Sequence, residues 1–262
     1  ESYQAEFKKK EKRDLDKIDT MIKIDEVIYK NKLNKVSFAA KKGEVIGIGG
    51  LHGQGQEELI MMLAGALSID SGKYYLQGEE LKLSHPGDAI KKGIYLVPGD
   101  RQKDGLFVDH SILKNVVYPR FILKKEKLVL KLNNLNKITD EIILKTSIQP
   151  PQKEILVRNL SGGNQQKVVF GRWLQFKPKV LLLNDPAKGI DVGTKNDLYS
   201  ILHELSLKGT TIILYASSNE ELICNCDRVL IMFEGKVVEE IKYEDISDDK
   251  LIKSSLRVGA GS

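Results

Sequence analysis

The chain has 262 residues, of which 41% are hydrophobic and 29% charged, with a formal net charge of +5. This allows one large domain or two small ones, and no apolar run reaches the roughly 18 residues that a membrane-spanning helix needs. The basic excess is diffuse and mixed with acids, which argues against nucleic acid as a partner. Cys224 and Cys226 are the only cysteines and there are four histidines, so we expect reduced thiols and no metal site.

The first segment, 1–18, is charged and helix-prone, without a clear apolar face or an apolar signal region. The chain starts at Glu1 and not at Met, so we expect this segment to be a linker from a preceding part of a longer polypeptide. Residues 19–262 are then expected to form the folded domain.

The first part of that domain shows strand patterns. Apolar and polar residues alternate at 21–28 and 33–38, and an apolar run at 44–50 ends in glycines. A helical pattern follows at 56–67, and 73–83 is predicted to form a hairpin. A strand, a glycine-rich loop and a helix in succession are the setting of a phosphate-binding loop.

Helical stretches dominate between about 100 and 160, where we predict a small helical subdomain after a strand at 93–101. Strands and helices alternate beyond it, which predicts a parallel sheet with helices on both faces. The predicted elements are a helix from Ser161 to about Phe176, a strand at 180–184, a helix at 193–207, a strand at 210–216, a helix near 218–225, and strands at 228–233 and 236–241.

The glycine-rich loop reads GLHGQGQE. Gly50, Gly53 and Gly55 keep the glycine spacing of the phosphate loop G-x-x-x-x-G-K-[ST], in which Lys contacts the phosphates and the hydroxyl holds Mg²⁺. Gln56 stands at the lysine position and Glu57 at the hydroxyl position. The loop has therefore lost its cation and its usual metal ligand.

The sequences GLHGQGQEEL, LSGGNQQK, LLLNDPAKGID and DRVLIMFEGK occur in the order and spacing of ATP-binding cassette domains. The resemblance spans about residues 20–245 and implies an α/β P-loop NTPase fold with an antiparallel β subdomain and a helical subdomain. The stretches VPGDRQKDGL, LSGGNQQKVVFGRWL and KGIDVGTK look like the second of two fused cassettes in monosaccharide importers.

In that family two cassettes face each other head to tail. Each nucleotide lies between the phosphate loop of one cassette and the LSGG signature of the other. The resemblance therefore raises two separate questions: whether this chain hydrolyses ATP at its own site, and whether it completes the site of its partner.

Several positions of the chain's own site depart from the family. The departures are Gln56 and Glu57, Asn184 where an Asp orients Mg²⁺, Asp185 where a Glu activates water, Ser217 at the switch His, and Gly99 where a Gln senses the γ-phosphate. Asp is one methylene shorter than Glu, and misplacement of that order costs about 100-fold in rate. Binding of ATP without useful hydrolysis, no binding, and slow hydrolysis all remain open.

The signature motif, by contrast, is intact. Ser161 is suited to bond a γ-phosphate, and Gly162 and Gly163 open a helix whose positive end points at the anion. Gln165 follows as in the family. Asp191 matches the residue of the loop that crosses the interface between cassettes, and it also suits a helix N-cap.

Two further candidates, Tyr29 and Lys188, each allow two interpretations. Tyr29 lies where an aromatic ring stacks on adenine, or is a core residue at a strand edge. Lys188 contacts phosphate or is a surface residue. Arg101 and Lys103 lie in the loop that meets the membrane subunit in the family, and Trp173 and Phe176 are expected in the core.

We therefore expect the degenerate ATP-binding subunit of a monosaccharide importer, with ATP as its ligand and with Mg²⁺ binding impaired at its own site. Its partners would be a competent first cassette in the same polypeptide, membrane permease subunits and, indirectly, a sugar-binding protein, at the cytoplasmic face of the membrane. The alternatives are an active ATPase cassette of a nucleoside or related importer and a soluble cassette without a permease. The sequence does not identify the sugar.

Overall fold

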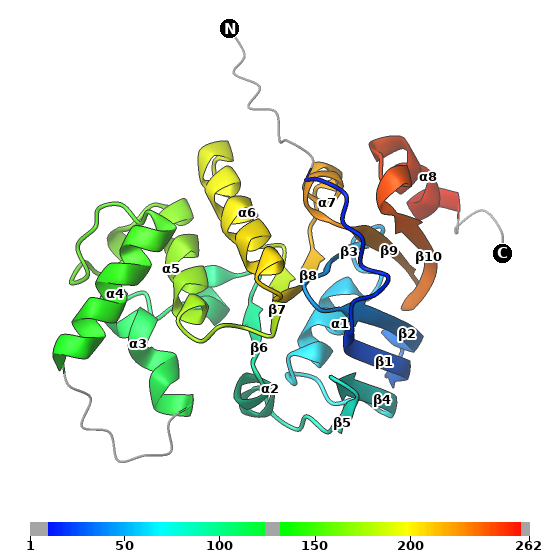
Figure 1. Ribbon diagram of the computed structural model, residues 1–262, viewed down its shortest axis with the longest axis horizontal. Coiled ribbons are helices and arrows are strands. Elements are labelled where there is room, and N and C mark those ends of the chain that lie inside the picture. The colour runs from blue at the N-terminus through cyan, green and yellow to red at the C-terminus, as the bar shows by residue number, and fades with distance from the viewer. Residues whose placement is uncertain (1–9, 124–131, 258–262) are drawn as a thin grey trace, which may run out of the picture.

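The computed structural model describes residues 10–123 and 132–257. Its strands form two sheets, with helices packed against them (Figure 1). A four-stranded antiparallel sheet has the order β2-β1-β4-β5. Its strands are β1 (Thr20–Tyr29), β2 (Leu33–Lys41), β4 (Ser71–Leu76) and β5 (Glu79–Leu81). The prediction of an antiparallel β part with a hairpin near 73–83 is confirmed.

The second sheet has six strands in the order β10-β9-β3-β8-β7-β6 and is parallel except at β9–β10. The strands are β3 (Val45–Gly49), β6 (Ile94–Val97), β7 (Val180–Asn184), β8 (Thr211–Tyr215), β9 (Arg228–Phe233) and β10 (Lys236–Lys242). The sequence placed all six within a few residues, because buried parallel strands are continuous apolar runs.

The helices are α1 (Gln56–Leu63), α2 (Pro86–Lys92), α3 (Ile112–Leu123), α4 (Leu132–Thr146), α5 (Gly162–Leu174), α6 (Val192–Leu207), α7 (Asn219–Asn225) and α8 (Asp248–Arg257). Sequence reasoning missed α2 and α8. Helix α2 is short and begins with Pro and Gly, which are typical of a turn. Pro is nevertheless favoured at the first helical position, and His85 caps the helix by accepting a hydrogen bond from the Gly87 N–H. The second is largely polar, with a sparse apolar face.

Two cores lie on opposite faces of the central sheet because successive strand residues point to opposite sides. On β7, Leu181 and Leu183 join the core beneath the helical part, whereas Val180 and Leu182 join the core beneath the antiparallel sheet and α1. This arrangement fixes the loops at the carboxyl ends of the parallel strands, where ligands of open α/β sheets bind.

The predicted helical subdomain, about 100–160, contains α3 and α4, and α5 packs on both of them, as Figure 1 shows on one side of the sheet. The ring of Trp173 on α5 stacks on Tyr95 at 4.6 Å between centroids, and its Nε1–H donates to the Leu96 carbonyl at 2.9 Å. Trp173 is buried and Phe176 is half-buried against the same core, so the core prediction for both is confirmed. Residues 124–131 of the predicted subdomain lie outside the described residues.

Residues 10–18, which we name the N-terminal strap, contain no helix, contrary to the helix-prone reading of the sequence. They run along the domain close to α7 and β9 (Figure 1). Lys10 and Arg13 form ion pairs with Asp227 at 2.6 and 2.5 Å. Long-range charge pairing outweighs local helix propensity here, because a packed extended segment satisfies those side chains.

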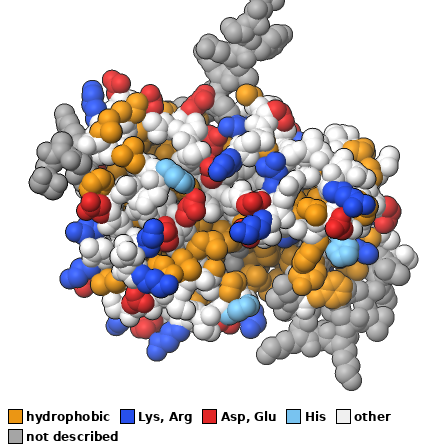
Figure 2. Space-filling view, turned by 180° about the vertical axis from the view of Figure 1, so that it is seen from behind, with side chains coloured by type: hydrophobic (Ala, Val, Ile, Leu, Met, Phe, Trp, Pro, Cys, Tyr) orange, Lys and Arg blue, Asp and Glu red, His pale blue; other side chains and the backbone are white. Residues whose placement is uncertain are grey.

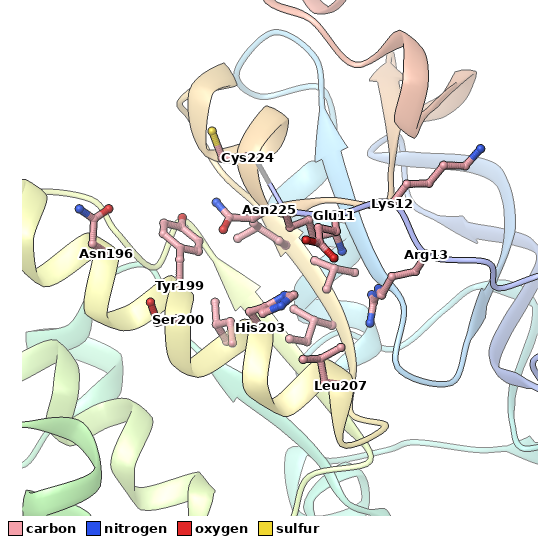
Figure 3. A pocket seen from close by; sticks show the side chains of 15 residues that line it. Glu11, Lys12, Arg13, Asn196, Tyr199, Ser200, His203, Leu207, Cys224 and Asn225 are labelled. Carbon is pink, nitrogen blue, oxygen red and sulfur yellow. The ribbon is translucent and has the colours of Figure 1, made fainter. Parts of the chain in front are cut away.

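A cavity of about 700 Å³ lies between the strap, α6 and α7, and Figure 3 shows Arg13 and His203 reaching into this space from opposite sides. Both cysteines are buried, and burial raises the pKa of the Cys226 thiol. Within the described ranges, no helix has the length and apolar character needed to cross a bilayer.

Candidate functional site

The loop between β3 and α1 is folded around the side chain of Gln56. This side chain is 1% exposed, and its Oε1 accepts from the Gln54 backbone N–H at 2.9 Å. Its Nε2 donates to the Leu51 carbonyl at 2.8 Å. The carboxamide thus uses one of the loop N–H groups that a phosphate-binding loop would present to its ligand.

Glycine is required at two positions of this loop. Gly50 has a φ of 121°, and a Cβ there would lie 2.3 Å from the Met232 carbonyl oxygen of β9. Gly55, the N-cap of α1, has a φ of 104°, and a Cβ would lie 2.7 Å from the Lys32 carbonyl oxygen. Gly53 also has positive φ. The glycine pattern therefore still sets the loop's shape, although the residue after it has changed.

The structure brings together the residues predicted at the ends of β7 and β8. The Asp185 carboxylate accepts from both the backbone N–H and the hydroxyl of Ser217, each at 3.1 Å. Asp185 has a φ of 47°, a region that few residues other than glycine adopt. Next to it, Asn184 Oδ1 is buried without a hydrogen-bond partner among the described residues, and Gly99 lies against Asn184.

The surroundings of the loop carry negative charge. Burial raises the pKa of Tyr215 to about 12, with the carboxylates of Asp185 and Glu57 acting in the same direction. The Tyr215 hydroxyl lies 3.0 Å from Nδ1 of His52 in the loop. Two carboxylates therefore face this region, and the loop itself contributes no lysine or arginine.

The side chain of Gln56 fills the loop, and residues 50–57 include no lysine or arginine in place of the missing one. Among the described residues, no group of three or more His, Cys, Asp or Glu side chains is placed to hold a metal ion. Asn184 offers a neutral oxygen where a carboxylate is usual in the family, and among the described residues no donor reaches its Oδ1.

The β1–β2 turn lies beside the glycine-rich loop. A cavity of about 650 Å³ is bounded by this turn, Gly53, Gln54 and the β9–β10 turn. Lys32 in the turn pairs with Glu58 of α1 at 3.6 Å. Tyr29 does not line the cavity; it is half-buried against the core, with the Lys30 ammonium 5.2 Å from its ring centroid.

The signature segment starts α5 and belongs to the helical part of the molecule, whereas α1 belongs to the sheet core (Figure 1). Ser161 is the exposed N-cap, and its Oγ accepts from the side-chain amide of Asn164 at 3.0 Å. Within 10–123 and 132–257, no side chain or carbonyl accepts a hydrogen bond from this hydroxyl. The two glycines allow close packing: a Cβ on Gly162 would lie 2.5 Å from Arg101 Nη2, and one on Gly163 would lie 2.7 Å from Thr194 Oγ1.

Gln165 and Asp191, two further predicted site residues, make hydrogen bonds within the chain. Gln165 is 3% exposed and turned inward, where its Nε2 donates to the Val157 and Leu160 carbonyls. It is placed to hold the loop before α5. Asp191 is the N-cap of α6 and accepts from both Thr194 N–H and Thr194 Oγ1–H at 2.9 Å. These two hydrogen bonds, one from the backbone N–H and one from the hydroxyl of Thr194, lower the pKa of the Asp191 carboxyl group.

Replacing Gly163 by alanine is expected to destabilise this corner by about 1–3 kcal/mol, because the new methyl group would overlap Thr194. The free energy of unfolding in urea measures the loss. The double variant Gly163→Ala with Thr194→Ala should lose less than the sum of the two single variants. Additive losses would mean that the methyl group meets no obstacle at Thr194.

Sequence reasoning missed three contacts of the site. Gln54 was not singled out, although its amide bonds Gln56 and its side chain accepts from Glu234 N–H at 2.7 Å. Thr194, which meets Gly163, lies in the stretch KGIDVGTK but was given no role of its own. Arg101 was predicted only to lie in the loop that meets the membrane subunit, and its contact with Gly162 of the signature was not foreseen. The contacts of Thr194 with Gly163 and of Arg101 with Gly162 join segments far apart in sequence, and no local pattern encodes them.

Comparisons with known proteins show which family the chain resembles. The chain is 37% identical over 235 residues, 88% of its length, to the ribose import ATP-binding protein RbsA of Caldanaerobacter subterraneus subsp. tengcongensis. It is 33% identical over 237 residues, 90% of its length, to that of Clostridium tetani. The chain spans about half of these relatives, 47% of each.

Among solved structures, MJ1267 in its ADP conformation, an ATP-binding cassette of an ABC transporter, has the same fold. It superimposes with a TM-score of 0.77 at 22% identity, over 93% of this chain and 99% of the other. The family model described as ABC transporter matches residues 33–188, which include the glycine loop, the signature and the strand before Asp185. The chain therefore belongs to the ABC transporter family.

Proposed function

We propose that this chain is the degenerate ATP-binding cassette of a monosaccharide importer and acts mainly through a partner cassette. In this proposal the partner binds ATP in its own phosphate loop, and this chain supplies Ser161, Gly162 and Gly163 to the terminal phosphate. The partner would be a first cassette in the same polypeptide. ATP at the partner's site would drive transport, and this chain's own site would contribute little turnover.

The observation that carries the proposal is the contrast between the two motifs. The Gln56 carboxamide makes both of its hydrogen bonds to the backbone of its own loop. Ser161 is exposed at the N-terminus of α5, and among the described residues its hydroxyl acts only as an acceptor. A helix N-terminus with a free hydroxyl favours an oxyanion. The chain is thus better equipped to complete a nucleotide site than to hold one.

The proposed partners follow from the surface and from the relatives. Phe107, Tyr118 and Phe121 are 43%, 46% and 53% exposed on the helical part. Figure 2 shows hydrophobic side chains gathered between this part and the sheet core. We assign this exposed aromatic group, with the loop that carries Lys103, to a cytoplasmic loop of the membrane permease. A ribose-type monosaccharide, delivered by a binding protein, is the proposed cargo, since both relatives are named for ribose import.

Replacing Ser161 by alanine in the complete transporter is expected to lower ATP turnover at limiting ATP by about tenfold or more. The loss corresponds to one hydrogen bond to a charged group, about 1.5–3 kcal/mol. Release of phosphate by the purified, membrane-reconstituted transporter measures it. Ser71→Ala, at an exposed position that starts β4, is the matched control and should leave turnover unchanged.

Unchanged turnover in the Ser161 variant would show that the signature is not donated. The same assay on Asp185→Asn separates the alternative, an active cassette of a nucleoside or related importer. If the substitution at Asp185 abolished turnover and the one at Ser161 did not, hydrolysis would occur at this chain's own site, and the proposed division of roles would be wrong.

A further inference from the structure

We propose that Arg101 is a second binding residue, beside Ser161, for the terminal phosphate of the nucleotide held by the partner cassette. This inference rests on the proposed donation of the signature and adds to it a charged contact from another segment of the chain.

Arg101 is held in place by a turn of its own. It begins a single turn of π-helix, Arg101–Gly105, that follows β6. Asp100 caps this turn by accepting from the backbone N–H groups of Gln102 and Lys103 at 3.1 and 3.0 Å. The carboxylate of Asp100 is therefore engaged by its own turn. The turn directs the Arg101 side chain toward the start of α5.

The guanidinium packs on the bare Cα of Gly162. Its Nη2 lies so close that a Cβ on Gly162 would be 2.5 Å away, and its Nη1 donates to the Lys188 carbonyl at 3.2 Å. Arg101 thus joins the signature to the loop that precedes Asp191. The guanidinium fits at this position because Gly162 has no side chain.

The charge of Arg101 is not balanced within residues 10–123 and 132–257. Its Nε is buried without an acceptor, and its only hydrogen bond there is to the neutral carbonyl of Lys188. The carboxylate of Asp191, on the neighbouring loop, is engaged by Thr194. The side chain of Lys188, which is exposed, adds a further cation to the same loop.

A cation at this place needs an anion. The first turn of an α-helix already carries positive partial charge, so a guanidinium beside it is unfavourable unless a negative group lies between them. The planar guanidinium carries several N–H donors and matches a phosphate better than a single hydroxyl does. The terminal phosphate that Ser161 would bond is a ligand of this chemistry and meets both needs at once.

The test compares Arg101→Gln, Arg101→Lys and Ser161→Ala in the complete reconstituted transporter, with Mg²⁺-ATP as the ligand. We expect Arg101→Gln to raise KM for ATP by about tenfold or more and to weaken its dependence on salt, since a charged contact is lost. Arg101→Lys keeps the charge, and its KM for ATP should lie between those of Arg101→Gln and the unaltered protein. Lys82→Gln removes an exposed cation far from the signature and should change neither quantity.

The outcomes separate this inference from the proposed function. If Ser161→Ala impairs the transporter while Arg101→Gln has the KM and salt dependence of Lys82→Gln, the phosphate role of Arg101 is wrong and donation of the signature stands. A lower thermal stability of Arg101→Gln with unchanged KM would likewise assign Arg101 to structure alone. If Ser161→Ala has no effect, the proposed function itself fails.

Discussion

Replacing Asp227 by alanine is expected to release the N-terminal strap and to lower the free energy of unfolding by about 3–5 kcal/mol. The side chains of Asp227 and Lys10 are only 7% and 6% exposed, and Arg13 is 16% exposed. Removing the carboxylate leaves two buried cations without their anion, which costs more than the loss of a surface pair. Asp227 also accepts from the Val45 backbone N–H at 2.8 Å, so that amide loses its partner as well.

Urea denaturation measures the loss, and trypsin reports the strap directly, since Lys12 and Arg13 become cleavable when it detaches. Asp249→Ala removes one side of an exposed ion pair and should change stability by about 1 kcal/mol or less. Asp227→Asn keeps the shape of the side chain, and its loss in the free energy of unfolding should lie between those of Asp227→Ala and Asp249→Ala. A strap that resists trypsin in Asp227→Ala as well as in the unaltered chain would show that other contacts hold it.

The same cluster gives the strap a dependence on pH. Burial alone would raise the pKa of Asp227, but hydrogen bonds and charges from Arg13 and Lys10 outweigh it, so the net pKa lies below the ordinary value. A carboxyl group whose pKa is lowered by folding stabilises the fold above its unfolded pKa, about 4, and loses this contribution as the pH falls through its folded pKa. Acid should therefore weaken the strap, and Asp227→Ala should remove this part of the acid sensitivity.

Replacing Gln56 by lysine is expected to raise the affinity of this chain for Mg²⁺-ATP by about tenfold to a hundredfold. The change restores a charged donor to the phosphates, worth about 1.5–3 kcal/mol. It also frees the Gln54 N–H, which the Gln56 carboxamide now occupies. Calorimetric titration with ATP, with and without Mg²⁺, measures the gain.

Gln56→Ala is the matched variant because it empties the loop without adding charge. If alanine and lysine raise the affinity equally, occupancy of the loop by Gln56 is what limits binding; if only lysine does, the missing cation limits it. Tight, Mg²⁺-dependent binding by the unaltered chain would contradict the inference that Gln56, Glu57 and Asn184 impair this site.

The strands and the motif positions were predictable from sequence because both depend on local patterns. The apolar runs VIGIG and VLLLN became β3 and β7, and LSGG became the start of α5 with Ser161 as its N-cap. The short helix α2 was missed because its Pro and Gly resemble a turn. The strap was misjudged because its side chains find their partners in residues far along the chain.

By itself, the sequence determined the family, the two sheets and the loss of the phosphate-loop lysine, since each depends on the identity and order of neighbouring residues. Only the tertiary structure decided what fills the loop and what lies on the signature. Gln56 bonds Gln54 and Leu51 because the loop curls around its carboxamide. Arg101 reaches Gly162, 61 positions along the chain (162 − 101 = 61), because α5 packs against the turn that follows β6. These contacts depend on how distant elements pack, and packing is set by the whole core.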